Sequence, residues 1–330
     1  MSDQQPTERP VRDFPDRCAF RSTERDDPML GTAFPAGRLL LVEQPGPWGR
    51  LGLQQSRFDP DTAVDLITRS DRQGIRVLAI RRPGRVDAPT RRHWGYVDCR
   101  AGEPHLRWGR FDRDADLLEL DLDRLPEHLP ETPEGGGAVG APDPAPLFAV
   151  CAHSTHDACC AIRGRPVAAA LERRVPGRVW ECSHVGGDRF AANVLVLPSG
   201  ELYGRVPAGS AAELVTRSER GEVIVDLLRG RVGFRPVVQA AMAAAHRHTG
   251  LLRPADIRPL RLREVGSDGE RAVDAVDVDL ECAGRPLRVR VHRTRSAPYR
   301  MTCQAVMDST ALEYRPEVIG ADVPGALPVG

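Results

Sequence analysis

The 330-residue sequence predicts an α/β fold, in which two β-α-β-β units are followed by a helical and β-hairpin extension. Three observations lead to this prediction. A Pro- and Gly-rich stretch at residues 125–146 has no apolar periodicity and reads as a linker. Short apolar runs and one helix-like stretch follow in the same order on each side of it. After residue 207 the pattern changes to helices and alternating strands.

The first unit is expected to span residues 18–124, after a disordered, polar N-terminus at residues 1–17. Its elements follow in the order strand, helix, strand and a final pair of strands. These segments are 38–43, 61–72, 76–82, 94–99 and 105–108.

The second unit is expected to span residues 147–207 and to repeat this order. We expect its helix to open at Pro166, because proline is favoured at the first helical position. Two parallel strands joined by a helix and followed by an antiparallel hairpin form the carboxy-terminal part of a thioredoxin-like fold. Both units are therefore predicted to be thioredoxin-like. The predicted strands of the second unit are 147–151, 178–183, 193–198 and 201–206.

The extension is expected to cover residues 208–319, before a tail at residues 320–330. Pro236 begins a helix that Gly250 can end, because glycine readily adopts the left-handed conformation found after helices. Apolar and charged residues then alternate on both sides of an AGRP turn, which predicts a β-hairpin with one buried face.

Composition excludes several classes of function. The chain has 46 basic and 46 acidic residues, so it lacks the positive field expected of a nucleic-acid binder. It contains no lysine, which excludes a Schiff-base lysine and a Walker-type phosphate loop. The sequence contains no run of about 18 apolar residues, so no membrane-spanning helix is predicted. The polar N-terminus does not resemble a secretory signal, so we expect a cytoplasmic protein.

The densest set of groups that could bind a metal lies in CAHSTHDACC at residues 151–160, and a second set follows in CSHVGGDR at residues 182–189. Each segment follows a predicted parallel strand, and loops at the carboxyl ends of such strands lie side by side. Thiolate and imidazole together suit zinc or an iron–sulfur cluster. Eight residues separate Cys151 from Cys160, more than in an ordinary zinc knuckle, which favours a two-iron cluster. Gly186 and Gly187 would leave room for its bulk.

At these residues the chain resembles the sucrase/ferredoxin-like family, which belongs with the thioredoxin-like 2Fe-2S ferredoxins. The resemblance is carried by CAHSTHDACC with GRP, then by CSHVGGDRFAANVLVLP and YGRV, over roughly residues 147–205. A weaker likeness occurs near Cys18, in CAFRSTERDDPMLGTA, and in VEQPGPWG. No carboxylate pair supports hydrolysis, so no sucrase activity is expected.

The resemblance implies a set of cluster ligands. In the family, two cysteines separated by eight residues bind one iron, and two histidines of an HxGGH loop bind the other. The matching residues here are Cys151, Cys160 and His184. Asp188 stands in the place of the second histidine, so the fourth ligand is either Asp188 or Cys182.

The function implied by the resemblance is one-electron transfer with a redox protein as donor or acceptor, more a carrier than an enzyme. Histidine ligation would raise the potential of the cluster. Arg189 could stabilise its reduced form or dock an acidic partner. His153 and His156 read as solvated residues or as support for the ligands.

Two alternatives stay open at this point. One is a thiol oxidoreductase or redox sensor that uses Cys159, Cys160 or Cys182 as a nucleophile beside His184. The other is a structural zinc module. Among the remaining cysteines, Cys282 and Cys303 are expected to pack in the core. Cys159 reads as a buried packing thiol, and Cys18 and Cys99 have no evident partner.

Overall fold

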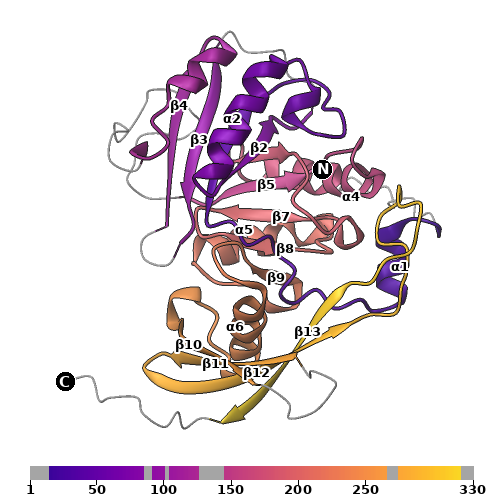
Figure 1. Ribbon diagram of the computed structural model, residues 1–330, viewed down its shortest axis with the longest axis vertical. Coiled ribbons are helices and arrows are strands. Elements are labelled where there is room, and N and C mark those ends of the chain that lie inside the picture. The colour runs from indigo at the N-terminus through magenta and orange to yellow at the C-terminus, as the bar shows by residue number, and fades with distance from the viewer. Residues whose placement is uncertain (1–14, 85–90, 101–103, 126–144, 266–273, 321–330) are drawn as a thin grey trace, which may run out of the picture.

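The computed structural model describes residues 15–84, 91–100, 104–125, 145–265 and 274–320. The predicted disordered N-terminus, linker and tail lie almost entirely outside these residues. The described part is a mixed α/β structure with a nine-stranded mixed sheet and a four-stranded antiparallel sheet (Figure 1). None of the described helices has the length and apolar character needed to cross a membrane.

The first half of the large sheet follows the predicted element order. Strand β1 pairs in parallel with β2 and antiparallel with β3, which pairs with β4. Helix α2 begins at Pro60, because the Asp59 side chain accepts a hydrogen bond of 2.8 Å from the Thr62 backbone N–H. The bounds are α1 Cys18–Glu24, β1 Arg38–Glu43, α2 Pro60–Arg72, β2 Ile75–Arg81, β3 Arg92–Asp98 and β4 His105–Phe111.

The second half of the sheet repeats these pairings. Strand β5 pairs in parallel with β6 and antiparallel with β7, which pairs with β8, and β9 extends the sheet. Strands β2 and β6 pair antiparallel and join the two halves edge to edge. The bounds are β5 Leu147–Cys151, α4 Ala158–Glu172, β6 Val179–Cys182, β7 Val194–Leu197, β8 Glu201–Tyr203 and β9 Leu228–Arg231.

Helix α4 differs from the prediction, because it begins at Ala158 and Pro166 lies in its interior. The Asp157 side chain caps it by accepting a hydrogen bond of 2.8 Å from the Cys159 backbone N–H. Gly164 lets the helix pack closely against the end of β5, since a Cβ there would lie 2.1 Å from the Cys151 carbonyl oxygen. The first turn of α4 is thereby held beside the end of β5.

The extension contains more strands than the predicted hairpin. Strands β11 and β12 form that hairpin, and β10 and β13 flank it in the order β10-β11-β12-β13. Helix α6 begins at Pro236 and ends at Gly250, as predicted, and packs between this sheet and β9 (Figure 1). The bounds are α5 Ala211–Glu219, α6 Pro236–Thr249, β10 Ile257–Val265, β11 Asp274–Cys282, β12 Arg285–Arg295 and β13 Leu312–Gly320. Short 3-10 helices are η1 Leu53–Gln55, η2 Asp114–Glu119, η3 Asp188–Phe190, η4 Ala208–Ser210, η5 Val225–Leu227 and η6 Pro254–Asp256.

Candidate metal centre

The carboxyl ends of β5 and β6 bring the three predicted core ligands together. Cys151 is the last residue of β5, Cys160 lies in the first turn of α4, and His184 follows β6 by two residues. Their ligand atoms all lie within 4.8 Å of one another. Both cysteines are fully buried, whereas the His184 side chain is 22% exposed. Two thiols and one imidazole from distant segments therefore share one buried position.

Asp188, in η3, lies beside this trio. Its Oδ1 is 2.9 Å from His184 Nδ1 and accepts a hydrogen bond of 3.0 Å from the Cys160 thiol. His184 Nδ1 is buried and faces this carboxylate. Nδ1 and Oδ1 therefore form a buried pair of potential ligand atoms.

Cys182 is the other residue predicted as a possible fourth ligand. Its side chain is fully buried. Cys182 is the last residue of β6, and in the sheet it is the register partner of Cys151 in β5 and of Ile80 in β2. It belongs to none of the candidate metal-binding groups among the described residues. Burial raises the pKa of its thiol. Of the two candidates, Asp188 is the one that contacts Cys160 and His184.

The electrostatics of the site favour the ionised forms of Cys151 and Asp188. A hydrogen bond from Cys160 lowers the pKa of Cys151 well below its usual value, and burial only partly opposes this. Burial alone would lower the pKa of His184, but hydrogen bonds with Asp188 and Cys151 raise it to about 9. Burial opposes ionisation of Asp188, yet the bond to His184 keeps its pKa below the usual value. A thiolate and a carboxylate, the forms that bind metals, are therefore stabilised here.

Two further histidines contact the His184 loop. His153 is buried, donates from Nε2 to the Gly49 carbonyl at 2.7 Å, and accepts at Nδ1 from the His184 backbone N–H at 3.2 Å. The His156 ring stacks on the His184 ring with a centroid distance of 3.7 Å. His156, His184 and Asp188 also place their ligand atoms within 4.8 Å of one another. His153 thus orients the loop, and His156 is a further possible ligand that the sequence suggested only as a supporting residue.

The two glycines of the loop have positive φ angles, 79° at Gly186 and 72° at Gly187. A Cβ at Gly187 would lie 2.5 Å from Nη2 of Arg229, whereas a Cβ at Gly186 would have no neighbour within 4 Å. The sequence suggested that both glycines make room for a cofactor. In the structure, the group that crowds Gly187 is the Arg229 side chain.

Arg229, on β9, is a buried cation that no sequence motif indicated. Its guanidinium donates to the Gly186 carbonyl at 2.9 Å and to Asn193 Oδ1 at 2.8 Å, and it also bonds to Thr32. All of these acceptors are neutral. Burial lowers its pKa to about 9, whereas the nearby charges of Cys151 and Asp188 oppose that shift. Arg229 is buried and lies 41 residues after Asp188, so no local sequence pattern indicated its role.

Arg189, predicted to act beside the site, turns toward another part of the chain. Its Nη1 donates to Met301 Sδ at 3.8 Å, and its Nε lies 3.7 Å from Asp27 Oδ2. The buried positive charge beside the His184 loop is therefore that of Arg229.

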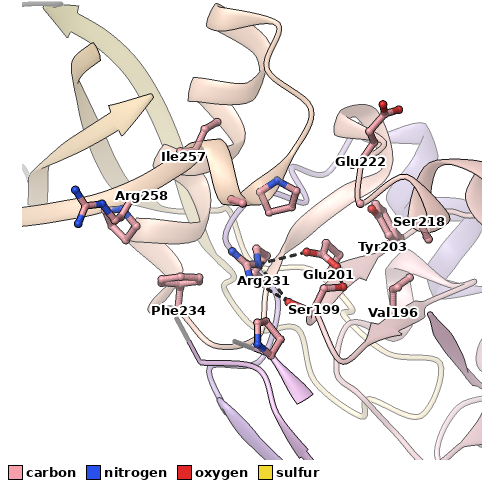
Figure 2. Close-up of a pocket in the computed structure, with 15 residues that line it drawn as sticks. Val196, Ser199, Glu201, Tyr203, Ser218, Glu222, Arg231, Phe234, Ile257 and Arg258 are labelled. Atoms are coloured by element: carbon pink, nitrogen blue, oxygen red, sulfur yellow. Dashed lines mark hydrogen bonds and ion pairs between the residues drawn. The ribbon is translucent and has the colours of Figure 1, made fainter. Parts of the chain in front are cut away.

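Two cavities lie in different parts of the fold. One cavity, of about 510 Å³, borders the segment between β5 and α4, and its lining includes Trp48, Arg81 and His153. The other, of about 420 Å³, lies beside β8, β9 and the start of β10 (Figure 2). In it Arg231 bonds to the Ser199 carbonyl and pairs with Glu201. The described residues that line this second cavity include no cysteine or histidine, so it is separate from the metal centre.

In a comparison with protein families, residues 87–230 match the family described as sucrase/ferredoxin-like. No curated protein and no solved structure matches the chain. The matched segment contains all four residues Cys151, Cys160, His184 and Asp188, together with Arg229. Residues 87–230 are thus similar to the sucrase/ferredoxin-like family, as the cysteine and histidine motifs predicted.

Proposed function

We propose that this protein is an electron carrier that holds a 2Fe-2S cluster through Cys151, Cys160, His184 and Asp188. The observation that carries the proposal is the group of two buried thiols and an imidazole, whose ligand atoms lie within 4.8 Å of one another at the ends of two parallel strands. Asp188 adds a fourth donor to the set. Such clusters use four protein ligands, either four thiolates or, in Rieske-type centres, two thiolates and two imidazoles. When bound, the cluster supplies one-electron redox chemistry.

The surrounding residues support this proposal by orientation and charge. His153 holds the backbone of His184, and Gly164 lets α4 place Cys160 over the end of β5. Arg229 adds a buried positive charge whose hydrogen-bond partners are neutral. A thiolate-ligated centre is anionic, so this charge would stabilise it, and it would favour the reduced form more than the oxidised form.

Exposure indicates where a redox partner would approach. Cys151 and Cys160 are inaccessible, whereas the side chains of His184 and His156 are 22% and 26% exposed. The stacked imidazole rings therefore form the part of the site nearest to solvent. We expect the electron donor or acceptor to dock over these two rings.

A structural zinc ion at the same residues is the second candidate. Zinc favours four N, O and S ligands in a tetrahedron, and the ligand atoms of Cys151, Cys160 and His184 are compact enough for a single ion. A thiol-based function has less support. Hydrogen bonding to Cys151 and burial raise the pKa of Cys160, and burial raises that of Cys182, so both are poor nucleophiles.

The test is the metal content and visible absorption of protein purified without air. Two irons and two sulfides per chain, with charge-transfer bands that dithionite bleaches, are expected in the wild type. Cys160→Ser should lose them. Cys282→Ser, which changes a cysteine buried in the core beneath α6, is the matched control and should keep them. A colourless protein that stays iron-free after reconstitution, with zinc that disappears in Cys160→Ser, would establish the zinc alternative instead.

A further inference from the structure

Three cysteines outside the proposed cluster ligands converge from distant parts of the chain. Cys18 is the first residue of α1, Cys159 lies in the first turn of α4, and Cys303 lies in the loop between β12 and β13. Their sulfurs are 3.6 Å apart for Cys18 and Cys159, 3.4 Å for Cys159 and Cys303, and 3.5 Å for Cys303 and Cys18. Figure 1 shows the loop before β13 beside α1. The three thiols thus form a nearly equilateral triangle.

This arrangement corrects two expectations from the sequence. Cys303 was expected in the core, but it lies half-buried in a turn rather than in an alternating strand. Cys18, without an evident partner in the sequence, contacts a cysteine 285 residues away. The spacing of neighbouring residues in the sequence cannot predict the contacts of Cys18 and Cys303, because these contacts depend on how distant parts of the chain pack together. Cys159 is buried, as predicted, but its neighbours are these two thiols.

Asp157 adds a carboxylate to the triangle. Its Oδ1 caps α4, while its Oδ2 accepts a hydrogen bond of 2.7 Å from the Cys303 backbone N–H and lies 3.6 Å from Cys18 Sγ. The side chain is fully buried and has no ion pair among the described residues. Its ligand atom and the three sulfurs all lie within 4.8 Å of one another.

We propose that Cys18, Cys159, Cys303 and Asp157 form a second, structural site for a zinc ion. A Zn–S distance of about 2.3 Å places the sulfurs of a tetrahedron about 3.8 Å apart. The observed sulfur separations are slightly shorter and nearly equal. Three thiolates and one carboxylate would complete a closed four-coordinate site, the type typical of structural zinc.

A disulfide explains the arrangement less well. It would bring two of the sulfurs to about 2.0 Å and leave the third unpaired, whereas all three are free thiols at similar distances. The Cys18 backbone N–H also donates a hydrogen bond of 3.4 Å to the Cys303 sulfur.

The ion would join three segments from distant parts of the chain. It would link α1 and the loop before β13 to the start of α4. The link between Cys18 and Cys303 would close a loop that contains most of the chain. Cross-links that close long loops remove the most entropy from the unfolded chain. Cys159 and the proposed cluster ligand Cys160 are neighbours, so the same ion would hold the helix start on which Cys160 depends. The zinc proposal uses none of the proposed cluster ligands.

The experiment measures zinc and iron per chain in the intact protein. Cys18→Ser and Cys303→Ser should each lose one equivalent of zinc and keep the iron, whereas Cys160→Ser should lose iron and keep this zinc. Cys99→Ser, which changes a buried cysteine elsewhere, should keep both metals. Zinc that is unchanged in Cys18→Ser, or iron lost in its place, would overturn the proposal.

Because a serine variant can fail to fold, the wild type gives a second readout. Protein stripped with a chelator should regain zinc, and zinc should then protect three thiols from alkylation. Peptide mass mapping should identify them as Cys18, Cys159 and Cys303. Protection of Cys151 and Cys160 alone, or a disulfide among the three, would contradict a zinc site here.

Discussion

Asp188 occupies the position at which the resembling family has its second histidine, and its contacts make it testable as a ligand. We expect Asp188→Ala to lose most of the iron and sulfide, because its Oδ1 is next to both Cys160 and His184. Asp188→His should keep the cluster and raise its reduction potential, because imidazole ligands raise the potential of two-iron clusters. Iron analysis and a redox titration measure both effects.

Cys182→Ser is the control for this prediction. Its sulfur belongs to no candidate metal group in the described residues, so the variant should keep its iron. Loss of the cluster in Cys182→Ser with retention in Asp188→Ala would reverse the assignment of the fourth ligand.

The two loop glycines provide a matched pair. Alanine at either position costs about 1–2 kcal/mol, because both have positive φ angles. Only Gly187→Ala also collides with the Arg229 guanidinium. We therefore expect Gly187→Ala to lose more stability and more iron than Gly186→Ala, as measured by urea unfolding and iron content. Equal losses would mean that the contact with Arg229 does not shape the loop.

At this scale the sequence predicted that Cys151, Cys160 and His184 would meet. Each lies close to the end of a strand or the start of a helix, and such ends meet in α/β sheets. Arg229 and the pair of Cys18 and Cys303 were missed. Their partners are far away in sequence, so only tertiary packing reveals them.

Among the elements, the strands were predicted more accurately than the helix that carries Cys160. Strands β1 and β5 have the predicted bounds, because each contains a short apolar run bounded by polar or turn residues. Helix α4 was predicted to start at Pro166, since proline is common at a first helical position. The cap by Asp157 was the competing signal, and it places the start eight residues earlier.

The end of helix α6 should give a pH-dependent contribution to stability. His246 is buried, and its Nδ1–H donates to the Leu251 carbonyl at 2.6 Å. Burial lowers its pKa in the folded state below the unfolded value of about 6.5. The unfolded chain thus binds a proton at His246 more readily than the folded chain does. The free energy of unfolding that His246 contributes above a pH of about 6.5 is therefore lost as the pH decreases toward the folded pKa.

We expect His246→Asn, which can still donate to the Leu251 carbonyl, to reduce this decline. The measurement is the free energy of unfolding by urea at several pH values between about 5 and 8. His248→Asn, at an exposed position on the same helix, controls for the loss of a histidine. Parallel stability curves for the wild type and His246→Asn would refute the assignment to His246.

In the whole molecule, the two halves of the large sheet depend on a short seam between β2 and β6. Arg81 and Glu181 cross this seam at 2.7 Å, with side chains 17% and 7% exposed. Arg81→Met should destabilise the protein by about 3–5 kcal/mol, because it leaves a buried carboxylate without its partner. Urea unfolding followed by fluorescence measures the loss.

The double variant Arg81→Met/Glu181→Gln is the control. It removes the unpaired charge, so it should recover part of the stability lost in Arg81→Met. A double variant no more stable than the single one would show that Arg81 acts through its contacts with Trp48 and the Gly46 carbonyl.

The seam also has a symmetry that explains the place of Cys182. Glu43 and Cys151 end equivalent strands, and their parallel partners are Ile80 and Cys182. Ile80 and Cys182 then pair with each other across the seam, so a pseudo-twofold axis passes between them. Separated from the first half, the second half would expose the edge of β6. In the intact protein this edge pairs antiparallel with the equivalent strand β2, so the β6 edges of two fragments could pair with each other in the same way. Two such fragments should therefore associate as a homodimer with Cys182 facing Cys182.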